Sequence, residues 1–230
     1  MQIVINNTEY KVPSDIDEIS LGTYIQWNSE FGNDLQSELS KIIEANYEDE
    51  TLKTLLIDDH LDKEALAWFS FHTKLDFSII ENTPDVLPLL EIYKGLKGLL
   101  YMSELDALTP KASFNWNDGE WVIQDYKVDA KSSMTFNEII TSKELMRQIH
   151  KVGLSKWDAM PYLCAIFLRR PYEAFDESFV HENSERIELM KQLPLTIAFN
   201  VAFFLTNCVN SLAKISPYSQ QEEGLMKSPN

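Results

Sequence analysis

The chain has 230 residues, of which 44% are hydrophobic and 11% aromatic, a composition far from that of disordered chains. Its 36 acidic and 20 basic side chains give a net charge of −16, whereas nucleic-acid binding depends on Lys and Arg displacing counterions from phosphates. The composition therefore predicts a globular protein and argues against a nucleic-acid partner. The charge is also uneven, because residues 1–107 carry 21 acidic and 7 basic side chains and residues 108–230 carry 15 and 13.

Membrane insertion and disulfide formation are both disfavoured by the sequence. The longest apolar run, in residues 195–205, is interrupted by two polar residues and is shorter than the roughly 18 to 20 residues that a membrane span needs. Cys164 and Cys208 lie within apolar helical patterns, where a free thiol behaves as a small hydrophobic residue. Since no signal-peptide pattern is present, we expect two reduced core thiols, no membrane partner and a cytoplasmic protein.

Two short segments have the alternation of β-hairpins. In residues 3–12, apolar and polar residues alternate on either side of Asn6-Asn7, and residues 114–123 repeat the pattern around Asn117-Asp118-Gly119. We expect the second turn to need a positive φ at Gly119. The two hairpins align with an offset of 111 residues, so they are two ordinary hairpins or two copies of one hairpin-helix unit. They either form one four-stranded antiparallel sheet or dock separately on their own helices.

Most of the remaining chain has helical periodicity. Ser20 is expected to cap a helix that ends at Gly32-Asn33, and an amphipathic helix follows. Apolar residues then recur at helical spacing through residues 51–106. Because Gly95 and Gly98 each weaken a helix by about 1 kcal/mol relative to Ala, we expect several short helices there. The sequence thus predicts an α+β fold, predominantly helical, with two small hairpins and about eight helices.

The chain divides by composition into three parts. Residues 1–107 form an acidic part with the first hairpin, residues 108–215 contain the second hairpin and the apolar C-terminal helix, and residues 216–230 are predicted to be a disordered tail. In the C-terminal helix, Phe204 is predicted to lie on the inward face. Phe199 and Phe203 are predicted to lie at the edge of that face or toward a partner.

No recognisable catalytic or metal-binding motif is present. Asp58-Asp59-His60, followed by His72, lacks the spacings of zinc ligands, so we interpret this cluster as a solvated helix boundary. The patterns of a nucleophile elbow or a phosphate-binding loop do not occur. The sequence predicts no catalytic, cofactor-binding or metal-binding residue, no cofactor and no enzymatic activity. A small enzyme with an unrecognised site is the alternative.

Arg169 and Arg170 end an apolar run directly before Pro171. They fit the C-terminus of a helix, where cations are stabilised by the negative end of the helix dipole. Alternatively, they pair with nearby acidic residues such as Glu173 and fix the geometry of the following loop.

Three segments, together with the opening hairpin, match soft hydrophobic patterns of one family. They are Ile19 to Ile25 (ISLGTYI), Ala165 to Phe175 (AIFLRRPYEAF) and Leu193 to Phe204 (LPLTIAFNVAFF). In these features the chain resembles tail assembly chaperone-like proteins of tailed bacteriophages. Residues 47–110 lie outside the resemblance, and Gly22-Thr23-Tyr24 stands where the family pattern has Gly-Gln.

This resemblance implies a non-enzymatic chaperone that binds the helical tape-measure protein, or another tail protein, and keeps it soluble in the host cytoplasm. A structural subunit of the baseplate, neck or hub is the alternative, and self-association into a homo-oligomer stays open. Client helices would lie in apolar grooves, where aromatic and Met side chains are enriched. The residues expected to bind the partner are Trp27, Met160, Phe199 and Phe203.

Overall fold

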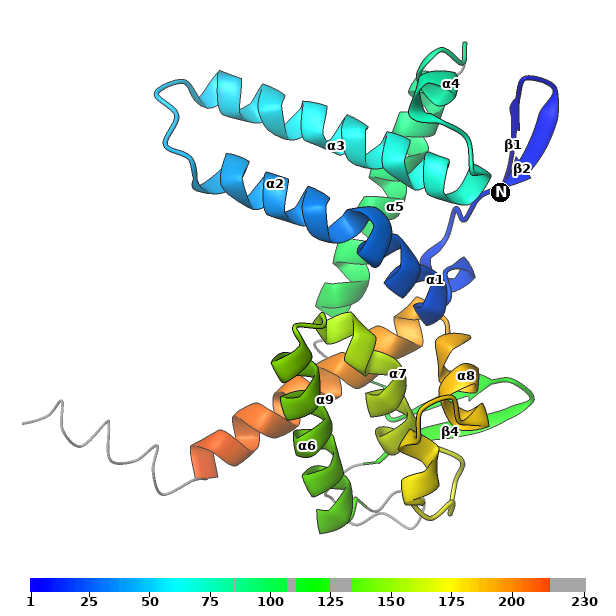
Figure 1. The fold of residues 1–230 in the computed structure, drawn as a ribbon, viewed down its shortest axis with the longest axis vertical. Helices are drawn as coiled ribbons and strands as arrows, with labels where there is room; N and C mark the ends of the chain where they lie inside the picture. The colour runs from blue at the N-terminus through cyan, green and yellow to red at the C-terminus, as the bar shows by residue number, and fades with distance from the viewer. Residues whose placement is uncertain (85, 107–110, 125–133, 216–230) are drawn as a thin grey trace, which may run out of the picture. The chain divides into compact units, whose positions relative to one another are not determined.

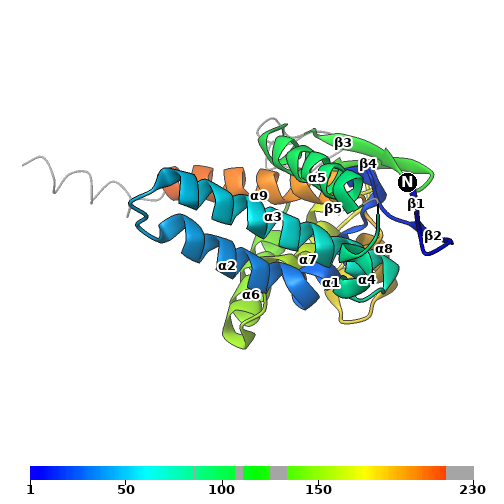
Figure 2. The ribbon, with the colours of Figure 1, turned by 90° about the horizontal axis from the view of Figure 1, so that it is seen from above.

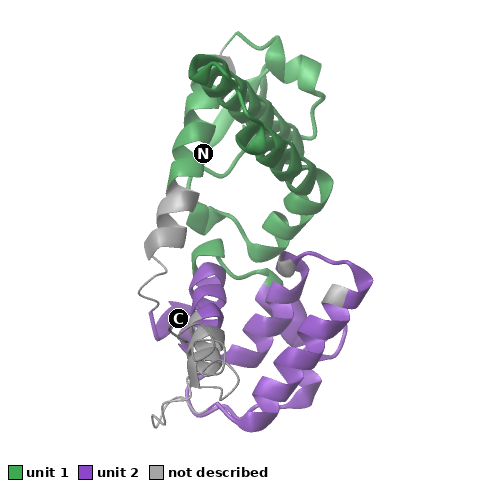
Figure 3. Cartoon of the chain, turned by 90° about the vertical axis from the view of Figure 1, so that its left-hand side faces the viewer, with its two compact units in different colours: residues 1–103, 191–196 green, residues 104–190, 197–230 purple. Residues whose placement is uncertain are grey.

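A computed structural model describes residues 1–84, 86–106, 111–124 and 134–215 (Figure 1). The predicted disordered tail therefore lies outside the described residues. The predicted class, α+β with helix predominant, is confirmed. The chain forms two compact units: unit 1 contains residues 1–103 and 191–196, and unit 2 contains residues 104–190 and 197–230 (Figure 3). The chain thus returns to unit 1 after most of unit 2 has been formed.

The first part of the chain contains one hairpin followed by helices. Its elements are β1 (Gln2–Ile5), β2 (Thr8–Lys11), α1 (Leu21–Trp27), α2 (Asn33–Glu44), α3 (Glu50–Thr73), α4 (Phe77–Glu81) and α5 (Val86–Asp106). The second part alternates between strands and helices. Its elements are β3 (Ser113–Trp116), β4 (Gly119–Ile123), α6 (Phe136–Val152), α7 (Lys156–Phe167), β5 (Leu168–Arg169), α8 (Glu185–Lys191) and α9 (Leu195–Ile215).

Both hairpins have a two-residue loop in the left-handed conformation. Asn6 and Asn7 have φ angles of 50° and 62°, and Asn117 and Asp118 have φ angles of 47° and 57°. Asn and Asp tolerate this conformation, which matches the twist of the flanking strands. The prediction that Gly119 supplies the positive φ is wrong, because Gly119 is the first residue of β4.

The two hairpins belong to separate sheets, so the alternative of one four-stranded sheet is not realised among the described residues. Strands β1 and β2 form a two-stranded sheet in unit 1. In unit 2, β4 pairs with β3 on one edge and with β5 on the other, with Val122 opposite Arg169 and Ile123 opposite Leu168. Because β5 follows α7 directly and occupies the free edge of β4, the second hairpin is docked on its own helices.

Helices α1 and α2 are joined by a π-helical turn at Asn28–Gly32, so the predicted end at Gly32-Asn33 is wrong. Gly32 has a helical φ of −62°. A Cβ added there would lie 2.3 Å from the side-chain oxygen of Asn28 and 2.8 Å from the indole of Trp27. The glycine is therefore explained by the close approach of these two side chains rather than by helix termination.

Residues 51–106 contain two long helices, where the sequence predicted only short ones. Helix α3 has 24 residues and α5 has 21. Helix α5 passes through Gly95 and Gly98 without a break. Its side chains at Leu89, Tyr93 and Leu96 are buried, and this packing offsets the low helix propensity of glycine.

Within unit 1, α2 and α3 lie side by side in opposite directions, and α5 crosses α3 (Figures 1 and 2). The crossing is marked by ion pairs of Lys94 with Asp58, at 3.0 Å, and of Lys97 with Glu64, at 2.6 Å. These contacts lie at and beyond residue 58 of α3. The first turns of α3, before residue 58, pair with α2 outside this crossing.

The two ends of the chain that carry the family resemblance meet within unit 1. The amide of Leu21 donates to the carbonyl of Leu193 at 2.8 Å, and the amide of Leu195 donates to the carbonyl of Ile19 at 2.9 Å. A Cβ at Gly22 would lie 3.1 Å from the carbonyl oxygen of Lys191. Residues 19–25 and 193–195 therefore form one closely packed junction, which the local sequence patterns did not predict.

Candidate functional site

Three of the four side chains predicted to bind a partner are buried. Trp27, Met160 and Phe199 are each 5% exposed, whereas Phe203 is half-buried. The indole of Trp27 packs edge-on against Trp68, with ring centroids 5.4 Å apart. These three buried side chains belong to the core in this conformation, so a partner would have to bind to other side chains.

The inward face of α9 differs from the predicted one at Phe199 and Phe204. Phe199 packs edge-on against Trp157 at 5.4 Å, and Val201 is fully buried. Phe204, which was predicted to be in the core, is half-buried like Phe203. The apolar residues of α9 extend so far around the helix that spacing alone did not identify the side that packs.

The cluster at Asp58-Asp59-His60 lies inside α3, so its interpretation as a helix boundary is wrong. His60 is buried, and its Nδ1 lies 4.0 Å from the carboxylate of Glu38. His72 is about 18 Å farther along the same helix and packs against Trp68 at 4.4 Å. Burial, assisted by the charge of Lys74, lowers the pKa of His72 to about 4. In the part of the chain that the structure describes, no three potential ligands come together as a metal site.

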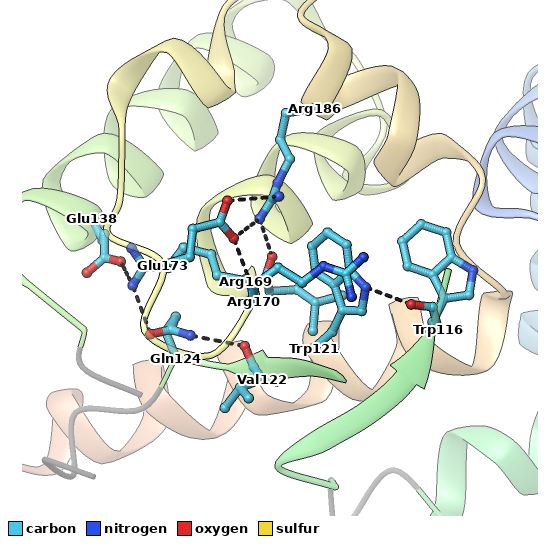
Figure 4. A network of polar contacts seen from close by, with 10 residues as sticks. Trp116, Trp121, Val122, Gln124, Glu138, Arg169, Arg170, Glu173 and Arg186 are labelled. Carbon is cyan, nitrogen blue, oxygen red and sulfur yellow. Dashed lines mark hydrogen bonds and ion pairs between the residues drawn. The ribbon is translucent and has the colours of Figure 1, made fainter. Parts of the chain in front are cut away.

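The most connected polar cluster surrounds Arg169 in β5 (Figure 4). Arg169 is 2% exposed and forms an ion pair with Glu138, which is completely buried at the start of α6. Its guanidinium also donates to the side-chain carbonyl of Gln124 at 2.9 Å, and that amide donates to the carbonyl of Val122 at 3.1 Å. The ion pair between Arg169 and Glu138 thus joins the first turn of α6 to the sheet.

Trp121 of β4 lies between two arginines (Figure 4). The guanidinium carbons of Arg170 and Arg186 lie 4.4 and 4.7 Å from its ring centroid, within the range of cation–π attraction. The indole nitrogen donates to the carbonyl of Trp116 at 2.9 Å. Arg170 also donates to the carbonyl of Asn117 at 2.8 Å, so it links β5 to the hairpin turn.

Arg186 connects the loop after β5 to that strand. It donates to the carbonyl of Leu168 at 2.9 Å and forms an ion pair with Glu173 at 3.1 Å. Glu173 also accepts from the amide of Arg170 at 2.8 Å. Burial lowers the pKa of Arg186, and the charge of Glu173 opposes this effect.

Of the two interpretations of the arginines, pairing with an acidic residue holds for Arg169, which lies in a strand and pairs with Glu138 rather than with the following loop. The side chain of Arg170 instead contacts Trp121 and the carbonyl of Asn117. The groups of this network bond to one another and hold the hairpin, β5 and the loop in place. We therefore assign the network a structural role. Its members were visible in the sequence, but Glu138 and Trp121 are too far from Arg169 in the chain to be recognised as its neighbours.

The chain was compared with known proteins at the level of families, sequences and structures. No family model, curated protein or solved structure matches it. The surface of the chain and the sequence patterns described above are therefore the features that bear on its function.

Large apolar side chains are exposed on several elements of the described surface, among them Leu87 of α5 and Tyr172, and two helical regions expose more than one of them. One is the end of the α2 and α3 pair in unit 1, with Ile43, Leu52 and Leu55; the other is α6 in unit 2, with Phe136 and Ile140. Phe136 and Ile140 are four residues apart and so share one helix face. None of the helices in the described ranges has the length and apolar character of a membrane span.

Proposed function

We propose that this chain is a non-enzymatic chaperone of phage tail assembly. It binds the helical tape-measure protein, or another tail protein, in the host cytoplasm and keeps that client soluble until the tail tube encloses it. The observation that supports the proposal most is the junction between residues 19–25 and 193–195. Two segments with family-like patterns are hydrogen-bonded neighbours although they lie at opposite ends of the sequence.

The surface suits such a role. Exposed apolar residues on α2, α3 and α6 can contact apolar client helices. The net charge of −16 makes complexes repel one another and so opposes their aggregation.

The test is co-expression with the tape-measure protein of the same phage. We expect the client to be found in the soluble fraction and to co-purify with this chain, and to precipitate when expressed alone. A client that is equally soluble without the chain would refute the proposal.

Mass spectrometry of purified particles separates this function from the structural alternative. A chaperone leaves before the tail is complete, so its peptides should be absent from particles. Their presence in stoichiometric amount would instead identify a subunit of the baseplate, neck or hub.

A further inference from the structure

The free end of the antiparallel helix pair α2 and α3, residues 43–57, is a distinct surface. We call it the hairpin tip, after this helical hairpin and not after the two β-hairpins. Helix α5 contacts α3 through Asp58 and Glu64, so the ion pairs between these helices lie at and beyond residue 58. The hairpin tip lies before this crossing. Two helices that pack only against each other leave apolar positions without cover, and a third helix would normally provide that cover.

Apolar side chains at the hairpin tip are in contact with solvent. Ile43, Leu52 and Leu55 are 51%, 47% and 57% exposed. Leu52 and Leu55 are three residues apart, so they lie on the same face of α3. Tyr47, Leu56 and Ile57 are half-buried beside them.

The hairpin tip is held in a defined conformation by polar contacts. The side chain of Lys53 donates to the carbonyl of Ile43 at 2.9 Å and so joins the end of α2 to the start of α3. The carboxylate of Asp49 accepts from the amide of Thr51 at 2.8 Å and caps α3. The exposed leucines are therefore presented by a preformed surface.

Acidic residues lie in the connection next to these apolar side chains. Glu44, Glu48, Asp49 and Glu50 are all exposed along the connection between the two helices. An apolar surface with an acidic rim is complementary to an apolar stripe flanked by cations. A second copy of this chain would bring the same acidic rim and would be repelled.

We propose that the hairpin tip is the docking site for an amphipathic helix of a partner protein, with Lys or Arg beside its apolar stripe. The partner helix lies against Leu52 and Leu55 as a third helix, and its cations face the acidic connection. The proposal deepens the function proposed above and rests on it only for the source of this helix, namely the client.

The test uses the full-length chain and fluorescent peptides of about 18 residues, or five helical turns. One peptide is an amphipathic Leu/Lys helix, the second has the same composition in a scrambled order, and the third replaces Lys by Glu. Fluorescence anisotropy should show binding of the Leu/Lys helix at least tenfold tighter than of either other peptide. Equal binding of the ordered and scrambled Leu/Lys peptides would mean attraction by net charge alone and would overturn the proposal.

Substitutions then locate the site. The double variant Leu52→Ser and Leu55→Ser leaves the charge unchanged and should weaken binding at least tenfold. The control Leu87→Ser, at a 70% exposed position of α5, should bind as the wild type does. Charge reversal of Glu48 and Glu50 to Lys should shift the preference toward the Leu/Glu peptide. Unchanged affinities in both sets of variants would overturn the proposal.

A dye-labelled Leu55→Cys variant provides a readout that does not depend on the stability of the double variant. The emission of a polarity-sensitive dye at this position should shift to the blue when the Leu/Lys peptide binds, and an unchanged spectrum would contradict docking at the hairpin tip. Sedimentation of the wild type and of the double variant tests whether a second copy of this chain binds at the hairpin tip instead. A wild-type dimer that the double variant does not form would make this surface a self-interface and overturn the proposal.

Co-purification of the tail protein keeps this inference separate from the proposed function. If the wild type and the double variant retain the client equally, the function stands and the docking site is wrong. If the peptides bind at the hairpin tip while no tail protein co-purifies, the docking site stands and the proposed function fails.

Discussion

Arg169 and Glu138 form an ion pair that is almost completely removed from solvent. Removal of one partner leaves a buried charge without its counter-charge, so Arg169→Met or Glu138→Leu should each lower the free energy of unfolding by about 3–5 kcal/mol. The double variant Arg169→Met with Glu138→Leu should cost clearly less than the sum of the two single changes. Urea denaturation of all three variants measures this coupling, and additive losses would contradict it.

The apolar side of α9 is defined by Phe199 rather than by the half-buried Phe204. Phe199→Ala should therefore lower the free energy of unfolding by about 3–5 kcal/mol, because it leaves a cavity beside Trp157. Phe203→Ala and Phe204→Ala should each cost less. Chemical denaturation of the three variants gives the order, and a larger loss for Phe204→Ala would restore the face predicted from the sequence.

His72 has a pKa of about 4 because burial disfavours its charged form. An unfolded histidine titrates near 6.5, so as the pH falls from about 6.5 to 4 the unfolded state binds a proton that the folded state does not. His72 therefore contributes to the loss of stability over this range and not above it. We expect His72→Phe to reduce that loss by roughly 1–2 kcal/mol, after a discount for the solvent-exposed part of the ring. Denaturation at pH 7 and at pH 4.5 tests this, and parallel pH profiles would rule the contribution out.

At the scale of elements, the second hairpin depends on side chains that reach it from outside. A Cβ at Gly119 would overlap the guanidinium of Arg170, which packs on Trp121. Gly119→Val should displace Arg170 from the indole and lower the melting temperature. The cause is lost packing rather than backbone strain, because Gly119 begins a strand with φ outside the left-handed region.

Gly95→Ala in α5 is the matched control for this change. No atom lies within 4 Å of the added Cβ, and Ala stabilises helices relative to Gly by up to about 1 kcal/mol. The melting temperature of this variant should therefore stay the same or rise. Indole fluorescence should change for Gly119→Val alone, and equal behaviour of the two variants would contradict the role of Arg170.

The two hairpins also show how far alternation predicts an element. Both were expected from polar and apolar alternation around Asn-rich turns, and both occur with the same two-residue loop. The shared register, Ile5 opposite Thr8 and Trp116 opposite Gly119, agrees with a duplicated unit and equally with two ordinary hairpins. The strand β5 was not predicted, because two residues are too few to show a period.

For the molecule as a whole, the function proposed above gives the net charge of −16 a role in keeping complexes with the client dispersed. Raising the salt concentration toward 1 M reduces the range of electrostatic repulsion to about 3 Å. The fold, which depends on buried apolar residues, should be retained, whereas complexes with the client should aggregate. Light scattering and circular dichroism on the same samples measure the two effects, and scattering that does not depend on salt would contradict this role of the charge.

The elements that could be predicted from the sequence are those whose signals are local. The Asn turns, the cap at Ser20 and the apolar periodicity of α9 each depend on residues within one or two turns of one another, so they predicted hairpins and helices in the right places. The same local signals predicted helix breaks at glycines where the helices continue. Glycines at positions 32, 95 and 98 are tolerated inside helices because tertiary packing offsets their cost.

Which faces are buried and which residues become neighbours depends on tertiary packing and was not predicted from the sequence. The sequence marked Trp27, Met160 and Phe199 as surface contacts because large apolar residues suit a core and an interface equally well. The packing around these three positions placed them in the core and left Leu52 and Leu55 exposed. Burial depends on which elements pack against one another. Contacts between residues that are distant in the chain produce no periodic pattern in the sequence, so they could not be predicted from it.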